Sequence, residues 1–332
     1  TFGEIMLRLA THGFYRFTQA TDYEATFGGC AANVAVSLAN FNEDVSFVTK
    51  LPTHDIGQCA VNDLRKYGVD TTMIVRGGNR VGIYYLEKGA SQRPSKVIYD
   101  RAGSSISEAS PTDFDWKEIF LDADWFHFTG ITPALNPQVA QITLEACKEA
   151  KKQGLQISCD LNFRKKLWTS EQANKTMSEI MPYVDVCIAN EEDAEKVFNI
   201  HASKTNVLTG ELNREGYIEV AKEISERFHC HTVAITLRKS ISAKWSAMLY
   251  QGGQAYFSKE YAIHIVDRVG GGDSFGAGLI YGLRHFEKPQ EIIEFAVAAS
   301  CLKHSIEGDY NRVTVDEVLT LANGDGSGRV QR

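Results

Sequence analysis

The chain has 332 residues, of which 43% are hydrophobic and 23% are charged, with a formal net charge of −7 at pH 7. Such a composition is ordinary for a soluble globular protein with room for one large α/β domain or two smaller ones. The acidic balance excludes nucleic acid as the main partner, and the absence of an apolar run of about 18 residues argues against a membrane span. Seven cysteines lack metal-binding spacing, so we expect reduced thiols in a cytoplasmic protein.

The first hundred residues predict short strands interspersed with two helices. The strand-like stretches are Thr1–Leu7, Tyr23–Thr26, Met73–Val75, Val81–Leu86 and Lys96–Tyr99. The helical patterns are Ala31–Asn40 and Ile56–Tyr67. Strands in this arrangement indicate a small sheet that projects from the main domain as a lid, formed by roughly residues 8–27 and 73–101. A lid of this kind excludes water from a reaction.

From about residue 120 onward, strand and helix patterns alternate. Strands are predicted at Trp125–Thr129, Leu155–Cys159, Val184–Ala189 and Thr232–Thr236, and helices at Asn136–Gln153, Thr169–Pro182, Asn190–Phe198 and Arg214–Phe228. Alternation of this kind predicts βαβ units in an α/β fold, with a mostly parallel central sheet between two layers of helices. We expect residues 1–332 to form a single domain, with ligands at the carboxyl ends of the strands.

The glycine-rich stretch near the end of the chain is its most informative motif. Gly270-Gly271-Gly272, hereafter the glycine turn, leads into Asp273 and an apolar helical pattern. Backbone N–H groups of such a turn at a helix N-terminus suit a phosphate or a developing oxyanion. The negative charge of Asp273 repels a phosphate, so its carboxylate does not suit phosphate binding alone. It suits a base that takes a proton from an alcohol attacking that phosphate. The alternative is that Asp273 only caps the helix.

A first glycine pair, Gly28-Gly29, opens the helix that carries Asn33. Small residues allow a ligand to approach the backbone, and the Asn33 amide can both donate to and accept from a hydroxyl. The alternative interpretation is a tight turn with Asn33 on an ordinary helix.

Two arginines and two tyrosines are candidates for binding an acidic substrate. Arg164 follows a buried strand, and Tyr99 and Arg101 belong to the predicted lid, as does Tyr84. A guanidinium is a planar fork suited to a carboxylate or a phosphate, whereas a neutral sugar needs no such cation. A surface charge or an ion pair is the alternative for each arginine. Strand alternation leaves open whether Tyr84 or Tyr85 faces the site.

The two glycine motifs, about 240 residues apart, resemble the two signatures of the ribokinase-like (PfkB) carbohydrate kinases. The second signature of that family usually has alanine where Gly271 stands, and Pro, Thr, Ser or Val where Arg268 stands. The resemblance implies a ribokinase-like three-layer α/β/α domain with a small β-sheet lid. It implies that Asp273 is the catalytic base and that the amides of the glycine turn form an anion hole.

Within that family, the Gly-Glu opening, the lid Tyr-x-Arg and the Asp-x-Asn-x-Arg segment look like the branch that phosphorylates 2-keto-3-deoxygluconate, at its 6-hydroxyl. The resemblance implies that the acid sugar is bound by Gly28, Gly29, Asn33, Tyr84, Tyr99, Arg101, Arg164 and Asp273. It assigns the nucleotide to Asn190, Thr236, Arg238, Gly270 and Gly272, although the Leu237–Ser240 segment lacks the glycine usual in the ATP loop.

The same resemblance implies ATP and Mg²⁺ as cofactors, with Asn190 and Asp193 acting on the metal through water. Asp193 is one methylene shorter than the glutamate usual in the family, and the acidic run could equally complement a helix dipole. A monovalent cation such as K⁺ stays open. We expect a homo-oligomer assembled through the lid.

Three alternatives remain at this point. The first is a kinase of a neutral sugar, such as a fructokinase or ribokinase-like enzyme. The second is a sugar-binding regulator that kept the fold without the catalysis. A dinucleotide-dependent dehydrogenase is weaker because no GxGxxG motif follows the first strand, and no Walker A sequence supports a P-loop mechanism.

Overall fold

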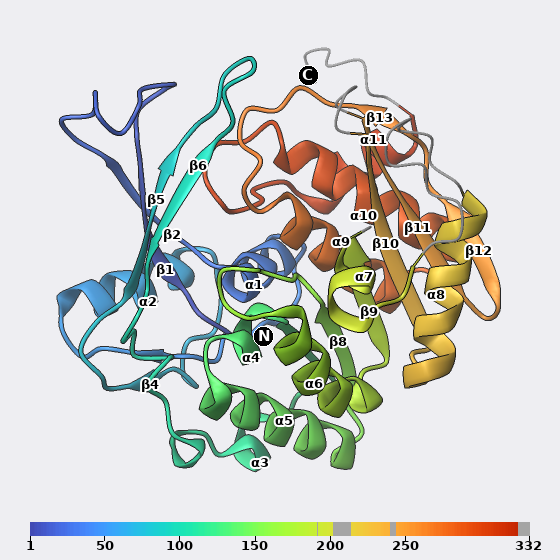
Figure 1. The fold of residues 1–332 in the computed structure, drawn as a ribbon, viewed down its shortest axis with the longest axis horizontal. Helices are drawn as coiled ribbons and strands as arrows, with labels where there is room; N and C mark the ends of the chain where they lie inside the picture. The colour runs from blue at the N-terminus through green and yellow to red at the C-terminus, as the bar shows by residue number, and fades with distance from the viewer. Residues whose placement is uncertain (191, 202–213, 240–243, 325–332) are drawn as a thin grey trace.

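A mixed sheet of seven strands forms the centre of the main domain (Figure 1). The structure is a computed structural model that describes residues 1–190, 192–201, 214–239 and 244–324. The strands are β7 (Trp125–Thr129), β8 (Gln156–Asp160), β9 (Val186–Asn190), β10 (Thr232–Lys239), β11 (Lys244–Gln251), β12 (Gln254–Phe257) and β13 (Tyr261–Ala262). Strands β7 to β10 run parallel, as predicted, and β11, β12 and β13 extend the sheet with antiparallel pairs.

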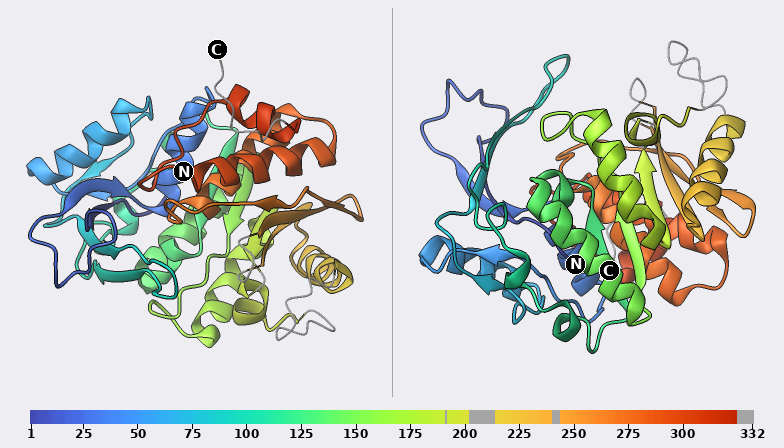
Figure 2. Two further views of the ribbon diagram at one scale, coloured as in Figure 1. Left: turned by 90° about the horizontal axis from the view of Figure 1, so that it is seen from above. Right: turned by 60° about the horizontal axis from the view of Figure 1, so that its bottom comes forward.

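Helices cover both faces of this sheet (Figure 2). One layer consists of α1 (Cys30–Asn40), α9 (Gly271–His285), α10 (Pro289–Lys303) and α11 (Val315–Ala322), and the other of α5 (Pro137–Lys152), α6 (Ser170–Ile180) and α8 (Arg214–Phe228). Strand β9 shows why two layers are needed. Its Cys187 side chain packs in the core beneath α5, α6 and α8, whereas its neighbour Ile188 packs in the core beneath α9 and α10. Successive strand residues point to opposite faces, so both faces require cover.

A second, four-stranded sheet projects beside the main domain in the order β2-β1-β5-β6 (Figure 1). Its strands are β1 (Met6–Ala10), β2 (Glu24–Gly28), β5 (Gly82–Glu87) and β6 (Lys96–Asp100). We call it the projecting sheet. The side chains of Met6, Arg8, Tyr84 and Leu86 lie on its buried face. These strands occupy the part of the chain in which the sequence predicted a lid.

Two predictions for the first hundred residues, one of them in the predicted lid, are wrong in detail. Met73–Val75 adds no strand to the projecting sheet, because β4 (Val75–Arg76) pairs with β3 (Lys50–Leu51) in a separate two-stranded sheet. The strand expected over Thr1–Leu7 begins only at Met6, since Phe2 forms bridges to Val48 and Phe128 instead. In both cases a short β-prone stretch has more than one possible partner, and the pattern does not choose between partners.

The remaining helices are short connections, apart from α2. They are α2 (Asp55–Lys66), α3 (Trp116–Ile119), α4 (Ile131–Ala134), α7 (Asp193–Phe198) and the 3-10 turns Pro111–Asp113 and Met181–Tyr183. Throughout the described ranges, we find no helix whose length and apolar character would suffice to cross a membrane.

Candidate active site

A cleft of about 770 Å³ lies between the projecting sheet and the carboxyl ends of the central strands. Most of the predicted site residues line it: Gly29, Asn33, Tyr84, Tyr99, Arg101, Arg164, Asn190, Asp193, Thr236, Gly270, Gly272 and Asp273. Gly28 and Gly271 do not reach its surface. Arg238 lies on β10 opposite Trp245, but its side chain is outside the described part of the structure.

The three glycines of the glycine turn have different surroundings, and only the first two leave no room for a side chain. Gly270 has a φ of +81°, and a Cβ there would lie 2.0 Å from the Asp309 carbonyl oxygen. A Cβ on Gly271 would lie 2.5 Å from the His304 ring. No atom lies within 4 Å of the place where a Gly272 Cβ would stand. The turn is therefore fixed from behind and open towards the cleft.

The first turn of α9 keeps two backbone donors available. The Gly271 N–H donates to the Arg268 carbonyl at 3.3 Å, whereas those of Gly272 and Asp273 have no acceptor among the described residues. Unpaired N–H groups at the positive end of a helix favour an anion. A phosphate can therefore be held at this point of the cleft.

Asp273 is a buried carboxylate at this helix start. Gly270, not Asp273, occupies the N-cap position, and no side chain caps the helix, so the capping alternative is not supported. The Asn33 Nδ2 group donates to Asp273 Oδ2 at 2.7 Å. Burial raises the pKa of Asp273 from 3.8 to about 6, although the bond from Asn33 acts in the opposite direction. At neutral pH the group is thus an ionised base of increased strength.

Asn33 uses both ends of its amide inside the protein. Its Oδ1 accepts from the Gly29 N–H at 3.2 Å, while its Nδ2 group donates to Asp273 and, at 3.3 Å, to Asp309 Oδ2. The glycine pair allows this packing, because a Cβ on Gly28 would lie 2.1 Å from Asp309 Oδ2 and one on Gly29 the same distance from the Glu4 carbonyl. Asn33 thus holds the carboxylate of Asp273 in place.

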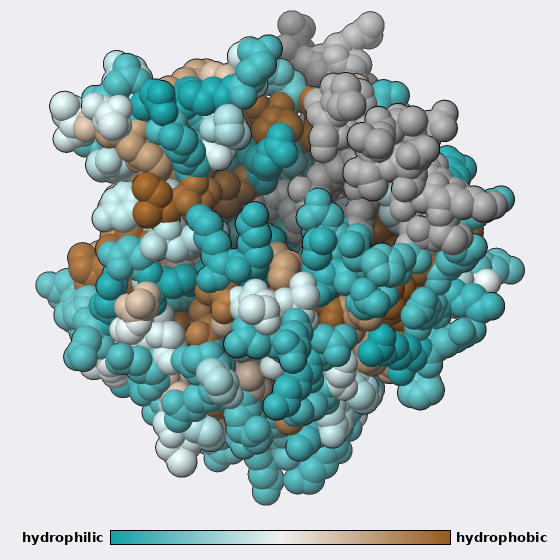
Figure 3. Space-filling view, in the orientation of Figure 1, coloured by the Kyte–Doolittle hydropathy of each residue, from teal (hydrophilic) through white to brown (hydrophobic). Residues whose placement is uncertain are grey.

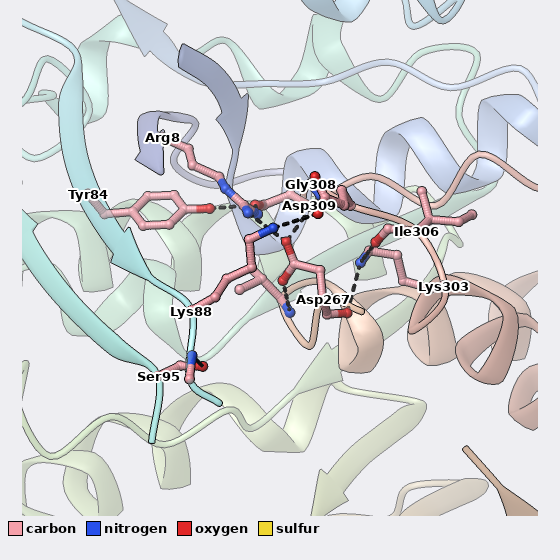
Figure 4. Close-up of polar contacts among 12 residues, drawn as sticks. Arg8, Tyr84, Lys88, Ser95, Asp267, Lys303, Ile306, Gly308 and Asp309 are labelled. Carbon is pink, nitrogen blue, oxygen red and sulfur yellow. Dashed lines mark hydrogen bonds and ion pairs between the residues drawn. The ribbon is translucent and has the colours of Figure 1, made fainter. Parts of the chain in front are cut away.

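Asp309 joins the projecting sheet to the site (Figure 4), and no motif of the sequence pointed to it. Arg8 Nη1 donates to Asp309 Oδ1 at 2.7 Å, and Arg8 Nη2 donates to Asp267 Oδ2 at 2.5 Å. The Tyr84 hydroxyl donates to Asp309 Oδ1 as well. All of these side chains are buried. Asp309 lies in an irregular segment after α10, 301 residues from Arg8, so no local pattern could connect them.

The two predicted arginines have different surroundings. Arg101 Nε donates to Glu4 Oε2 at 2.8 Å, so the charge of Arg101 is already paired. Arg164 Nη1 donates only to the Phe163 carbonyl, at 3.1 Å, and no carboxylate of a described residue lies within ion-pair distance of it. Arg164 is therefore the better placed of the two to bind an acidic group of a ligand.

The ambiguity between the adjacent tyrosines is resolved. Tyr84 is on the buried face of β5 and lines the cleft, whereas Tyr85 packs on the opposite face against Tyr23, with ring centroids 6.0 Å apart. Tyr99 pairs with Tyr84 across β5 and β6 and also lines the cleft.

Asn190 and Asp193 are placed together, but their oxygens accept backbone hydrogen bonds. Asp193 accepts from the N–H groups of Phe163 and Asn190, both at 3.0 Å. Asn190 Oδ1 accepts from the N–H groups of Glu192 and Asp193 at 2.8 and 3.1 Å. The sequence predicted that this helix begins at Asn190. These bonds explain why α7 begins only at Asp193.

The residues at this edge of the cleft fit only an indirectly held metal ion. Among the described residues, no three His, Cys, Asp or Glu side chains form a group that could hold a metal. Burial, with Asp193 and Asp273 nearby, raises the pKa of Asp160 well above its usual range. Mg²⁺ normally keeps several waters and binds substrate phosphates, so oxygens of this kind can act on it through water.

Comparison with known proteins agrees with this geometry. The sequence model of the PfkB family of carbohydrate kinases matches residues 2–314. A crystal structure of 2-dehydro-3-deoxygluconokinase from Thermotoga maritima is 52% identical, covers 97% of both chains and superposes with a TM-score of 0.93.

Two curated relatives are similar over nearly the whole chain. The 2-dehydro-3-deoxygalactonokinase of Haloferax volcanii is 30% identical over 99% of this chain and 97% of its own. The 2-dehydro-3-deoxygluconokinase of Bacillus subtilis is 25% identical over 96% and 93%. The chain therefore belongs to the PfkB family of carbohydrate kinases, enzymes that transfer a phosphoryl group to a sugar.

Proposed function

We propose that this kinase transfers the γ-phosphoryl group of ATP to the 6-hydroxyl of 2-keto-3-deoxygluconate, also named 2-dehydro-3-deoxygluconate. The observation that carries the proposal is the position of Asp273, a buried carboxylate at a helix start where two N–H groups have no acceptor within the described ranges. The choice of an acid sugar is supported by the named relatives and by the guanidinium of Arg164, which has no carboxylate partner in the part of the chain that the structure describes.

In the proposed reaction, Asp273 accepts the proton of the 6-hydroxyl as its oxygen attacks the γ-phosphorus and the bond to the β-phosphate oxygen breaks. Asn33 keeps the carboxylate oriented through its 2.7 Å hydrogen bond. The N–H groups of Gly272 and Asp273 stabilise the charge on the transferred group. Mg²⁺, when bound, neutralises phosphate charge, and Asn190 and Asp193 would hold it through water.

We propose that the sugar and the nucleotide bind at opposite ends of the cleft. Arg164 binds the sugar carboxylate, with Tyr99 and Arg101 on the β6 side and Tyr84 behind them. The nucleotide lies towards the end of β10, where Thr236 lines the cleft, and reaches the glycine turn. The projecting sheet then acts as a lid that excludes water, so that the sugar hydroxyl rather than water is phosphorylated.

The experiment that tests this function is a panel of sugars with ATP and Mg²⁺, in which ADP formation is followed. The panel contains 2-keto-3-deoxygluconate, its galacto epimer, 5-keto-2-deoxygluconate, fructose and ribose. We expect a 2-keto-3-deoxy acid to give the highest kcat/KM, with phosphate on O6 by NMR. A preference for fructose or ribose would establish the neutral-sugar alternative. An absence of sugar-dependent ADP would favour the regulator.

We also propose that two copies pair through the outer face of the projecting sheet. Leu7, Leu9, Ile83, Tyr85 and Ile98 share this face by strand register. The first four are only partly buried and Ile98 is 53% exposed. Hydrophobic residues are visible where this sheet lies at the left of the molecule (Figure 3). Asp100 and Lys96 lie on the same face of β6, at either side of Ile98. An exposed apolar patch with a polar rim is typical of an interface.

A further inference from the structure

Lys303, the last residue of α10, is completely buried, with 0% of its surface exposed. Lysine is rarely found in such a position, because its ammonium loses the hydration of water. Its Nζ donates to the carbonyl oxygens of Asp267 at 3.3 Å and Ile306 at 3.1 Å (Figure 4). The proposed reaction does not use the Lys303 ammonium, so the burial of this group needs another explanation.

The two carbonyls belong to the segments that flank the glycine turn. Asp267 begins the approach to the turn, and its carboxylate accepts from the N–H groups of Val269 at 3.0 Å and Gly308 at 3.1 Å. Ile306 belongs to the segment that leads to Asp309. A Cβ built on Gly270 would lie 3.2 Å from Lys303 Cε. The lysine thus lies directly behind the turn and fastens both segments.

The charges around the ammonium are balanced within the protein. Burial lowers the pKa of Lys303, whereas the Asp267 and Asp309 carboxylates act in the opposite direction. Arg8 pairs with the same two carboxylates, so two cations meet two anions in the buried group. Carbonyl oxygens beside carboxylates are also the environment that a monovalent cation such as K⁺ requires.

We propose that the Lys303 ammonium is a built-in cation that positions the glycine turn, and that the enzyme needs no monovalent metal ion there. Lys303 is a positioning residue, since it acts through the backbone of Asp267 and Ile306 and does not line the cleft. The assay rests on the proposed function.

The first measurement uses the unaltered enzyme. We expect kcat and kcat/KM to agree within about twofold in KCl, NH₄Cl, NaCl and tetramethylammonium chloride at one ionic strength. Activation of more than about fivefold by K⁺ over tetramethylammonium would overturn the proposal.

The second measurement compares two substitutions at one position. Lys303→Ala removes the ammonium and leaves space, whereas Lys303→Met fills most of that space with an uncharged chain. We expect kcat to fall at least about tenfold in both, with the KM for the sugar changed less. K⁺ or NH₄⁺ should restore kcat about tenfold in the Ala variant only. Lys259→Ala is the control, because Lys259 also donates to a backbone carbonyl, that of Ala322 at 2.7 Å, but this carbonyl does not belong to the segments that flank the glycine turn.

A folded Lys303→Ala protein that keeps its activity contradicts the proposal, as does one rescued equally by tetramethylammonium or not rescued at all. If the Ala variant does not fold, the Met variant and the unaltered enzyme decide. All comparisons are ratios on whichever sugar the enzyme accepts, so a failure with 2-keto-3-deoxygluconate rejects the proposed substrate alone. If no sugar is accepted, a K⁺-specific rise in the Tm of Lys303→Ala is the deciding readout.

Discussion

At Asp273, burial and hydrogen bonding act in opposite directions on one carboxylate. Burial raises its pKa and the bond from Asn33 limits the rise, which leaves a value of about 6. A carboxylate with this pKa is ionised at neutral pH and a stronger base than one in water. The same position at the start of α9 places it beside the phosphate that it is proposed to serve.

The first prediction concerns this side chain. Asp273→Asn keeps the size and the contact with Asn33 but removes the base, so kcat is expected to fall by about 10²- to 10⁴-fold. The Kd for the sugar, measured by calorimetry, should change by less than about tenfold. Turnover within tenfold of the unaltered enzyme would show that Asp273 is not the base.

The second prediction is a pH dependence. Because the folded pKa of Asp273 is about 6, kcat/KM should decrease about tenfold per pH unit below pH 6.

The native state binds this proton more tightly than the unfolded chain does. The contribution of Asp273 to stability therefore falls as the pH rises from about 4 to 6. Urea unfolding at pH 7.5 should then find Asp273→Asn more stable by about 1–3 kcal/mol. A less stable variant would contradict the raised pKa.

The third prediction concerns Arg164. Arg164→Ala should lower kcat/KM for the acid sugar by at least about 10²-fold, because a charge-assisted bond to the carboxylate is lost. Any neutral sugar that the enzyme accepts should be affected far less. Lys165→Ala is the matched control, since Lys165 is an exposed cation that does not line the cleft. Equal losses on acidic and neutral sugars would mean that Arg164 has a structural role.

At the scale of elements, the start of α9 can be tested by two alanine substitutions. Gly270→Ala should lower the Tm by several degrees, because φ is +81° and the methyl group would overlap the Asp309 carbonyl. Gly272→Ala meets no atom, so its Tm should stay within about two degrees while kcat falls. Thermal unfolding and turnover of both variants separate these effects. Equal losses of Tm would refute this division of roles.

The elements that the sequence predicted well are those with long, regular patterns. The parallel strands β7 to β10 and the helices α5, α6 and α8 follow from apolar periodicity, which is local. The glycine turn and Asp273 could also be predicted, because they form one contiguous sequence motif. Asp309 could not be, because its partner Arg8 is 301 residues away. An ion pair was one of the alternatives for Arg101, but its partner Glu4 could not be named, because it lies 97 residues away.

At the scale of the whole molecule, the outer face of the projecting sheet leads to a prediction about assembly. Ile98→Glu places a charge on that face, on the edge strand β6 and opposite Tyr85. We expect the substitution to convert a dimer into a monomer, as measured by light scattering. Glu108→Lys also changes a charge, but outside the sheet, and should leave the mass unchanged. A monomer already in the unaltered protein would reject the proposed interface.

The pairing of Arg8 with Asp309, and of Asn33 with Asp273, joins residues 301 and 240 positions apart. During synthesis, the N-terminal strands and α1 leave the ribosome long before the residues that complete the site exist. Arg8 lacks its first carboxylate partner until Asp267 has been made, and its second until Asp309 has been made. A chain cut shortly before Asp309 would retain most of the central sheet and lack a working site. Activity therefore requires synthesis of the chain at least as far as Asp309, the last residue of this hydrogen-bonded network.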